Sequence, residues 1–95
     1  MVYQLSQQAD FDLENIFDYS IEQFGFNQTQ KYISEFDIVF KTLCNNPAKG
    51  RKRDEIRKGL RSINKDSHVI FYRVMKTKIH IVRILHHTRD LPQYF

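Results

Sequence analysis

The sequence predicts an α+β fold: an N-terminal strand, an antiparallel helical hairpin, then a three-stranded antiparallel sheet. Two observations support this prediction. Two amphipathic helical segments lie close together in the first half of the chain, and strand-like segments follow one another in the second half. The 95 residues are enough for one domain, residues 1–95, whose core needs no disulfides. An apolar fraction of 41% is typical of a folded chain.

The first helix is expected to follow a short N-terminal strand. Residues 2–5 alternate between apolar and polar side chains, which predicts the strand, and Ser6 stands where the N-cap of a helix belongs. Acidic side chains, Asp12 among them, mark the solvent side of this helix, and Gly25 is expected to end it. Its apolar positions recur at helical spacing: Ala9, Leu13, Ile16, Phe17, Ser20 and Phe24.

A second helix is expected after a break of two residues. Asn27 and Gln30 have the spacing of a capping box, and Asn45-Asn46-Pro47 is expected to end the helix. Because the break is so short, the two helices must form an antiparallel hairpin, and their apolar stripes need a sheet to cover. The stripe of the second helix consists of Ile33, Phe36, Phe40 and Leu43.

The strongest strand signal in the chain lies in residues 68–87. Two apolar runs, residues 68–75 and 79–86, flank the polar residues 76–78 and predict a β-hairpin. In each run apolar side chains occur at both odd and even positions, so both faces of these strands are expected to be covered. Before them, residues 47–58 are expected to be irregular, and a further strand is expected to begin at residues 60–64.

The turn of this hairpin carries no signal that fixes its type, so the register stays open. A loop of two or four residues places Tyr72, Ile81 and Arg83 on one face. It leaves Arg73 and His86 on the other face, whereas a three-residue loop changes the grouping. In either case Arg73 and Arg83 interrupt apolar strands. Each needs solvent, a carboxylate or a partner, because breaking a buried charge pair costs about 3 to 5 kcal/mol.

Several classes of site are excluded or disfavoured. The chain has no GxxxxGK[ST], GxGxxG, GxSxG or HExxH motif, and Cys44 is its single cysteine. His80 and His86 would lie about 20 Å apart along one strand, too far to share a metal. No apolar run approaches a membrane span, and the N-terminus lacks a signal-peptide pattern. We therefore expect an intracellular, cytoplasmic protein with no cofactor, no metal and no membrane contact.

The two halves of the chain carry opposite charge. Residues 1–46 contain two lysines and seven acidic residues, a net charge of −5. Residues 47–95 contain thirteen lysines and arginines and four acidic residues, a net charge of +9. Such a basic half can bind nucleic acid, dock an acidic protein or complement the acidic half of its own chain. The sequence leaves these three interpretations open.

Six basic side chains fall on the predicted sheet or at the exit of its last strand. They are Arg61, Arg73, Arg83, His86, His87 and Arg89. Arginine and histidine together can bind a phosphodiester and exchange protons with it, so this set could bind or cut RNA. The same set could dock a carboxylate-rich protein. The purely structural alternative is that these arginines pair with Asp54, Glu55 and Asp90.

Six short motifs occur in a specific order along the chain. They are LSxxAxxDLxxI from Leu5 to Ile16, the helix end from Tyr19 to Gly25, NPxxGR from Asn46 to Arg51, DEIRxGLR from Asp54 to Arg61, HVIFYR from His68 to Arg73, and IxIxRILHxxxD from Ile79 to Asp90. In this order they resemble the ParE toxins of the RelE/ParE superfamily. The resemblance covers essentially the whole chain and implies a helical hairpin on a twisted antiparallel sheet.

The resemblance implies the toxic component of a type II toxin–antitoxin system, which acts in growth inhibition and in plasmid or chromosome maintenance. Such toxins inhibit DNA gyrase, and so replication, and are neutralised by direct binding of a cognate antitoxin that is acidic, partly disordered and DNA-binding. The six basic side chains become candidate gyrase contacts, and we expect no sequence-specific DNA binding by the toxin itself. Candidate antitoxin contacts are Ile33, Phe36, Phe40 and Arg57.

The RelE branch of the superfamily implies an alternative function, ribosome-dependent cleavage of mRNA. Its members carry an arginine directly after the residue that opens the first strand of the hairpin. Here Val69 follows His68, and the preceding strand offers only Arg61. These departures favour a gyrase inhibitor without catalytic residues, whereas His87 and Tyr94 keep the endonuclease as the alternative.

Overall fold

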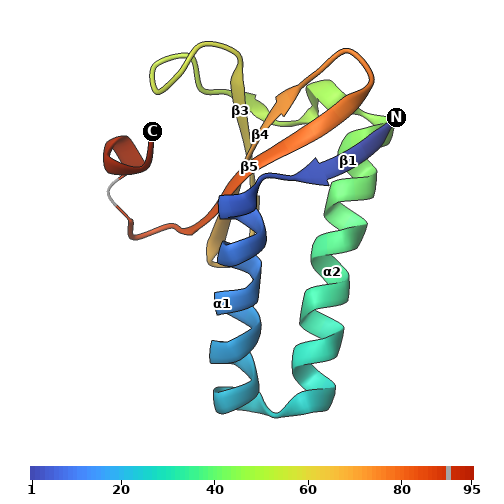
Figure 1. The fold of residues 1–95 in the computed structure, drawn as a ribbon, viewed down its shortest axis with the longest axis vertical. Coiled ribbons are helices and arrows are strands. Elements are labelled where there is room, and N and C mark those ends of the chain that lie inside the picture. The colour runs from blue at the N-terminus through green and yellow to red at the C-terminus, as the bar shows by residue number, and fades with distance from the viewer. Residues whose placement is uncertain (90) are drawn as a thin grey trace.

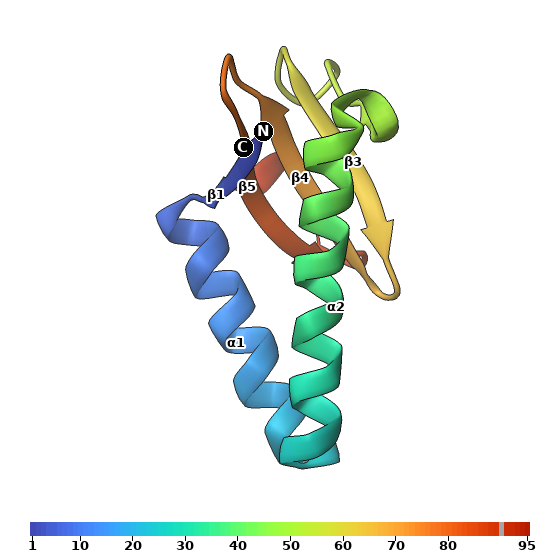
Figure 2. The ribbon, with the colours of Figure 1, turned by 90° about the vertical axis from the view of Figure 1, so that its right-hand side faces the viewer.

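A computed structural model describes residues 1–89 and 91–95 of the chain. Helices α1 (Gln7–Phe24) and α2 (Phe26–Asn45) form an antiparallel hairpin that covers one face of a five-stranded sheet (Figures 1 and 2). The turn of this hairpin projects beyond one end of the strands (Figure 2). The predicted α+β fold with a helical hairpin is therefore confirmed.

The sheet contains the predicted N-terminal strand, the predicted three-stranded antiparallel part and one further short strand within residues 47–58, which were expected to be irregular. Its order is β1-β5-β4-β3-β2, with β3 (Leu60–Lys65), β4 (His68–Val74) and β5 (Lys78–His86) antiparallel to one another. Strand β1 (Val2–Leu5) runs parallel to β5 at one edge, and the two-residue strand β2 (Arg51–Lys52) pairs with β3 at the other. The short helices η1 (Pro47–Lys49) and η2 (Leu91–Tyr94) complete the fold.

The observed helix ends match the predicted caps in part. The Ser6 hydroxyl accepts a hydrogen bond from the Ala9 backbone N–H at 2.9 Å, so the predicted N-cap of α1 is confirmed. Gly25, with φ of 83°, ends α1 and directly precedes α2. One glycine makes the whole turn, so α2 begins at Phe26 without a side-chain cap. The predicted capping box of Asn27 and Gln30 is wrong.

A β-bulge in β5 sets the faces of the central hairpin. Val74 pairs with Ile79, so four residues, 75–78, separate these paired positions, one of the two loop lengths expected to place Arg83 on the face of Tyr72. Val82 then stands as an extra residue, and Arg83 pairs with Phe71. Because an extra residue exchanges the faces of every later side chain, the expected grouping of Arg83 with Tyr72 is wrong.

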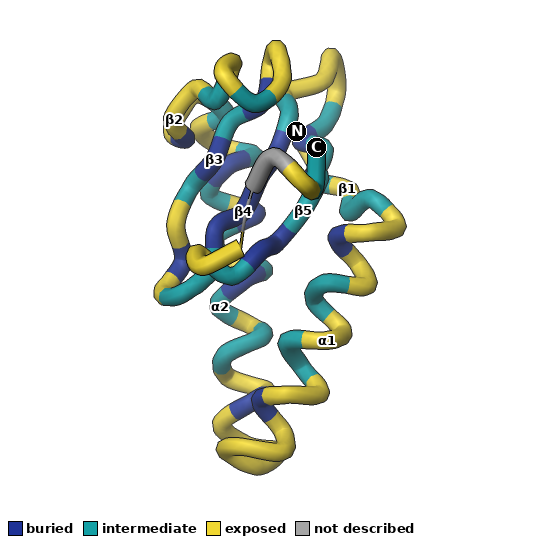
Figure 3. Tube along the Cα trace, turned by 90° about the vertical axis from the view of Figure 1, so that its left-hand side faces the viewer, coloured by how far each residue is buried: buried dark blue, intermediate teal, exposed yellow. Residues whose placement is uncertain are grey.

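Apolar clusters form on both faces of the sheet, as both-sided coverage of the hairpin predicts. Buried residues lie along the central strands β4 and β5 (Figure 3). The cluster under the helices contains the buried residues Ala9, Phe36, Phe40, Leu43, Ile70, Tyr72, Ile79, Ile81 and Ile84. On the opposite face, Leu60, Val69, Phe71 and Leu85 are covered by the loop between β2 and β3 and by the C-terminal aromatic residues. The Phe95 ring lies edge-on to Phe71, with 4.9 Å between centroids.

The NPxxGR break is tied to the core by one hydroxyl group. The Tyr72 hydroxyl accepts a hydrogen bond from the Gly50 N–H at 2.8 Å and donates one to the Pro47 carbonyl at 2.8 Å. A Cβ atom on Gly50 would collide with this hydroxyl, so only glycine permits the close approach. The contact fixes the start of β2 against β4, and with it the loop that follows.

Candidate functional site

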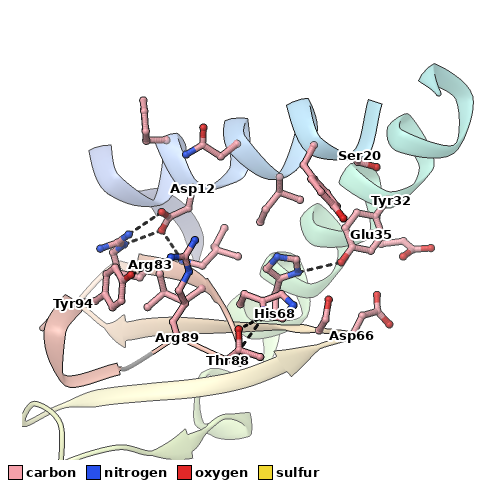
Figure 4. Close-up of a pocket in the computed structure, with 18 of the residues that line it drawn as sticks. Asp12, Ser20, Tyr32, Glu35, Asp66, His68, Arg83, Thr88, Arg89 and Tyr94 are labelled. Carbon is pink, nitrogen blue, oxygen red and sulfur yellow. Dashed lines mark hydrogen bonds and ion pairs between the residues drawn. The ribbon is translucent and has the colours of Figure 1, made fainter. Parts of the chain in front are cut away.

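A groove of about 1430 Å³ lies between the helical hairpin, the end of the sheet and the C-terminal tail (Figure 4). Phe11 and Tyr19 of α1 and Tyr32 of α2 give one wall an aromatic character. The other residues that line the groove include the basic side chains His86 and Arg89 and the acidic side chains Glu35 and Asp66. Ligand and partner sites commonly combine such an apolar wall with a few charged groups, so this groove is the candidate site.

An ion pair between α1 and β5 crosses the floor of the groove (Figure 4). The Asp12 carboxylate accepts hydrogen bonds at 2.8 Å from Nε and Nη2 of Arg83, and at 3.0 Å from the backbone N–H of Ile84. The two side chains are only 14% (Arg83) and 11% (Asp12) exposed, and the hydrogen bonds to Asp12 raise the pKa of Arg83 above its usual value. Arg83 therefore finds the carboxylate that it needs in Asp12, which was expected on the solvent side of its helix.

Three histidines gather where β5 ends. The rings of His68 and His86 lie edge to face with centroids 5.5 Å apart, and the rings of His86 and His87 stack at 4.6 Å. Because β5 ends at His86, the side chains of the adjacent His86 and His87 can lie on the same side of the sheet. Burial lowers the pKa of His68, and the charges of His86 and Lys65 lower it further. Among the described residues, no three His, Cys, Asp or Glu side chains are arranged to hold a metal ion.

Lys65 sits beside these histidines and is buried. Its Nζ atom donates to Glu35 at 2.9 Å and to Asp66 at 2.5 Å, and it lies 4.3 Å from the centroid of the Tyr32 ring. Burial by itself would lower the pKa of Lys65, but the hydrogen bonds to Asp66 and Glu35 raise it above its usual value. At this end of the groove, as at the Arg83 end, the buried cation is therefore paired with carboxylates of the chain itself.

The structure does not gather the six candidate gyrase contacts into one patch. His86, His87 and Arg89 lie together at the mouth of the groove, where Nη1 of Arg89 donates to the Tyr94 hydroxyl at 3.3 Å. Arg61 lies at the far end of the sheet and donates to the carbonyls of Ala48 and Gly50.

Arg73 is also far from the cluster of His68, His86 and His87, and it lies on the face opposite Arg61. Arg73 pairs with Leu60 and His80 on one face, whereas Arg61 pairs with the helix-facing Tyr72. Only His86, His87 and Arg89 therefore remain as a compact set of candidate gyrase contacts.

The candidate antitoxin contacts also divide. Phe36 and Phe40 are 0% and 1% exposed, so their rings belong to the core and are inaccessible to a partner in this conformation. Ile33 is half-buried, and Arg57 is exposed at the opposite end of the molecule. This part of the prediction is corrected for Phe36 and Phe40, because the apolar stripe of α2 is the surface that packs on the sheet.

Sequence reasoning missed the aromatic side chains that the helices expose. Phe11, Tyr19, Phe24 and Phe26 are 58% to 64% exposed, although Phe24 was expected in the apolar stripe. Phe24 and Phe26 flank the turn at Gly25, which projects beyond the sheet. The available signal was the aromatic character of Phe11 and Tyr19 at positions outside the apolar stripe of α1.

A family model described as "ParE toxin of type II toxin-antitoxin system, parDE" matches residues 3–91. The chain belongs to the ParE toxin family. Toxin ParE1 of Mycobacterium tuberculosis is 38% identical to it over 92 residues, 96% of this chain and 94% of that protein. Toxin ParE1 of Caulobacter vibrioides is 34% identical over 88 residues, 93% of this chain and 91% of that protein.

A solved structure supports the fold of this ParE family member. A chain of the "Chromosomal ParDE TA system from P. aeruginosa" superposes with a TM-score of 0.77 at 23% identity, covering 90% of this chain and 95% of that chain. The resemblance inferred from the ordered motifs is thus confirmed at the level of family and fold. No helix in the described part of the chain is long and apolar enough to cross a membrane.

Proposed function

We propose that this ParE family member is the toxin of a type II module that acts in the cytoplasm, inhibits DNA gyrase and so blocks replication, and is neutralised by direct binding of a cognate antitoxin. Family membership supports the general role. The groove is the observation that carries the specific proposal. Its aromatic wall adjoins His86 and Arg89, which stand among the candidate gyrase contacts.

The two walls of the groove suit an acidic, partly disordered antitoxin segment that orders on binding. Phe11 and Tyr19 are 62% and 64% exposed and offer aromatic anchors of the kind that dominate binding energy. Arg89, which is also exposed, offers a cation for the carboxylates of the segment. A segment in this position would cover the mouth of the groove and block the gyrase contacts.

Supercoiling by purified gyrase, measured with increasing amounts of the toxin, tests the inhibition. We expect loss of supercoiling and accumulation of cleavage complexes, and we expect the cognate antitoxin to restore activity. His86→Ala should weaken inhibition. His80→Ala is the matched control, because His80 lies on the same strand but on the face away from the groove. Unchanged supercoiling at stoichiometric excess of the folded toxin would contradict the proposal.

A second candidate function, cleavage of mRNA on the ribosome, is favoured by one observation. Tyr94, Arg89 and the stacked pair His86 and His87 lie at the same end of the sheet, and such groups can bind and protonate a phosphodiester. The engagement of Arg83 by Asp12 removes one cation from that set. Toeprinting on translated mRNA distinguishes the two functions, because only the endonuclease produces cuts in the ribosomal A site.

A further inference from the structure

The end of the sheet opposite the helical turn carries the densest positive charge of the chain. Residues 49–61 contain seven lysines and arginines and two acidic residues, and residues 73–78 contain three bases and no acid. The antiparallel order of β3, β4 and β5 brings these segments to one end (Figures 1 and 2). We name the exposed bases there the basic pole: Lys49, Arg51, Lys52, Arg57, Lys58 and Lys76.

The acidic residues of this end are already engaged within the loop. An oxygen of Asp54 accepts a hydrogen bond from the Gly59 N–H at 2.9 Å. Glu55 accepts one from Nε of Arg53 at 2.8 Å, which lowers the pKa of the Glu55 carboxyl. In the part of the chain that the structure describes, no carboxylate forms an ion pair with any member of the basic pole. The bases of the pole are therefore exposed outside any ion pair of the described chain, although the charge of Glu55 also interacts with that of Arg51.

The loop that presents these bases is held in place by its own backbone. The Arg53 N–H donates to the Leu60 carbonyl at 2.8 Å, and the Leu60 N–H donates to the Arg57 carbonyl at 3.0 Å. Ile56 packs on the apolar cluster of the outer sheet face. A surface ordered in advance loses less conformational entropy when it binds, so the pole is preorganised for a partner.

The character of the pole favours nucleic acid over protein. Protein interfaces depend on aromatic anchors in well-packed pockets, whereas contact with a nucleic-acid backbone depends mainly on charge. The exposed aromatic residues lie on α1 and at the helical turn, and the exposed apolar residues beside the pole, Val74 and Met75, are aliphatic. Without aromatic platforms on which single-stranded bases could stack, a duplex is the better fit.

We propose that the basic pole binds the phosphodiester backbone of duplex DNA without reading its sequence. The proposal does not depend on gyrase inhibition, because no member of the pole lines the groove. Duplex DNA carries one negative charge per about 1.7 Å of axis, a density that matches exposed bases crowded on two neighbouring segments. The pole would let the toxin contact DNA while the groove holds another partner.

The test is fluorescence anisotropy of a short labelled DNA duplex of mixed sequence titrated with the full-length toxin in the absence of gyrase. We expect a Kd of about 10⁻⁴ to 10⁻⁶ M at physiological salt, and a log Kd that rises with log salt by about 0.9 per phosphate contact. Lys52→Gln with Lys58→Gln should reduce this salt slope by about 2. The control Lys31→Gln with Lys41→Gln on α2 changes the net charge equally and should leave the slope unchanged.

Thermal melts show whether each double variant keeps its fold, which is expected because all four lysines are exposed. Three results would overturn the proposal. The first is no anisotropy change at low salt. The second is equal loss of binding in both double variants, because net charge alone would then explain it. The third is tighter binding of single-stranded RNA or polyglutamate than of duplex DNA.

Discussion

The two ends of this small toxin use their charged residues in opposite ways. At the groove end, Arg83 pairs with Asp12 and Lys65 pairs with Glu35 and Asp66, and these basic side chains are largely buried. At the basic pole, the exposed lysines and arginines have no carboxylate partner within the described chain. The environment of a cation, more than its residue type, therefore separates a structural role from a binding role.

The physical cause is the difference in the cost of burial. A charge removed from water must be paired, because an unpaired buried charge costs several kcal/mol, whereas an exposed charge stays hydrated at little cost. The acidic first half of the chain therefore complements the basic second half only where they meet across the groove. The excess charge at the far end is left for a partner.

The largest expected effect is the difference in stability loss between a buried and a half-buried side chain of α2. Phe36→Ala should lower the free energy of unfolding by about 3 to 5 kcal/mol, because it leaves a cavity under the sheet. Ile33→Ala removes a half-buried side chain and should cost about 1 kcal/mol. Urea denaturation measures both values. Equal losses would mean that Phe36 is as accessible as Ile33 and that the core is misassigned.

The next effect concerns the ion pair on the groove floor. Asp12→Ala leaves Arg83 and the Ile84 N–H without their acceptor and should destabilise the fold by about 2 to 3 kcal/mol. Glu14→Ala removes the same charge from an exposed position of α1 and should change stability by less than about 0.5 kcal/mol. If thermal unfolding gave the same midpoint for both variants, Arg83 would have to be free for a target.

Beside the basic pole, Tyr72→Phe should lower the free energy of unfolding by about 2 kcal/mol. The change removes only a hydroxyl group, but it leaves the Gly50 N–H and the Pro47 carbonyl unpaired beside the core. Amide hydrogen exchange should show faster exchange at Gly50, with little change in α1. Uniform exchange changes across both ends would argue against local anchoring of the basic loop by Tyr72.

The smallest expected effect is a pH dependence at the groove end. The pKa of His68 is held below its usual 6.5 by burial and by the nearby charges of His86 and Lys65, so the folded state favours the neutral ring. Stability should therefore be full above the unfolded pKa of 6.5 and fall as pH drops below it. Because His68 is only half-buried, solvent screening keeps this loss small. Urea denaturation at several pH values should show a shallower dependence for His68→Gln.

Local patterns were enough to predict the helical hairpin and the central strands. The cap at Ser6, the turn at Gly25 and the apolar runs of residues 68–86 depend on neighbours in sequence, and the structure confirms them. The bulge at Val82 was not predictable, because strands that are apolar at both parities do not reveal an extra residue. The parallel pairing of β1 with β5 was not predictable either, because it joins segments more than seventy residues apart.

The groove was predictable only in fragments. His86, Arg89 and the helical hairpin were identified separately, but the pairing of Asp12 with Arg83 requires knowing which side of α1 meets the sheet. The helical stripe predicted the burial of Phe36 and Phe40, which is the reason that they cannot serve as contacts. The separation of Arg61 and Arg73 onto opposite faces likewise follows from the register of β3 against β4, which the local sequence patterns did not predict.

The most direct test of two separate binding surfaces is a calorimetric titration of the cognate antitoxin into matched toxin variants. Phe11→Ser with Tyr19→Ser alters the exposed aromatic wall of the groove and should weaken binding more than tenfold, or about 1.4 kcal/mol. Lys52→Gln with Lys58→Gln alters the basic pole and should leave the antitoxin Kd nearly unchanged. Strong loss in the lysine variant with full affinity in the aromatic variant would contradict the assignment of the antitoxin to the groove.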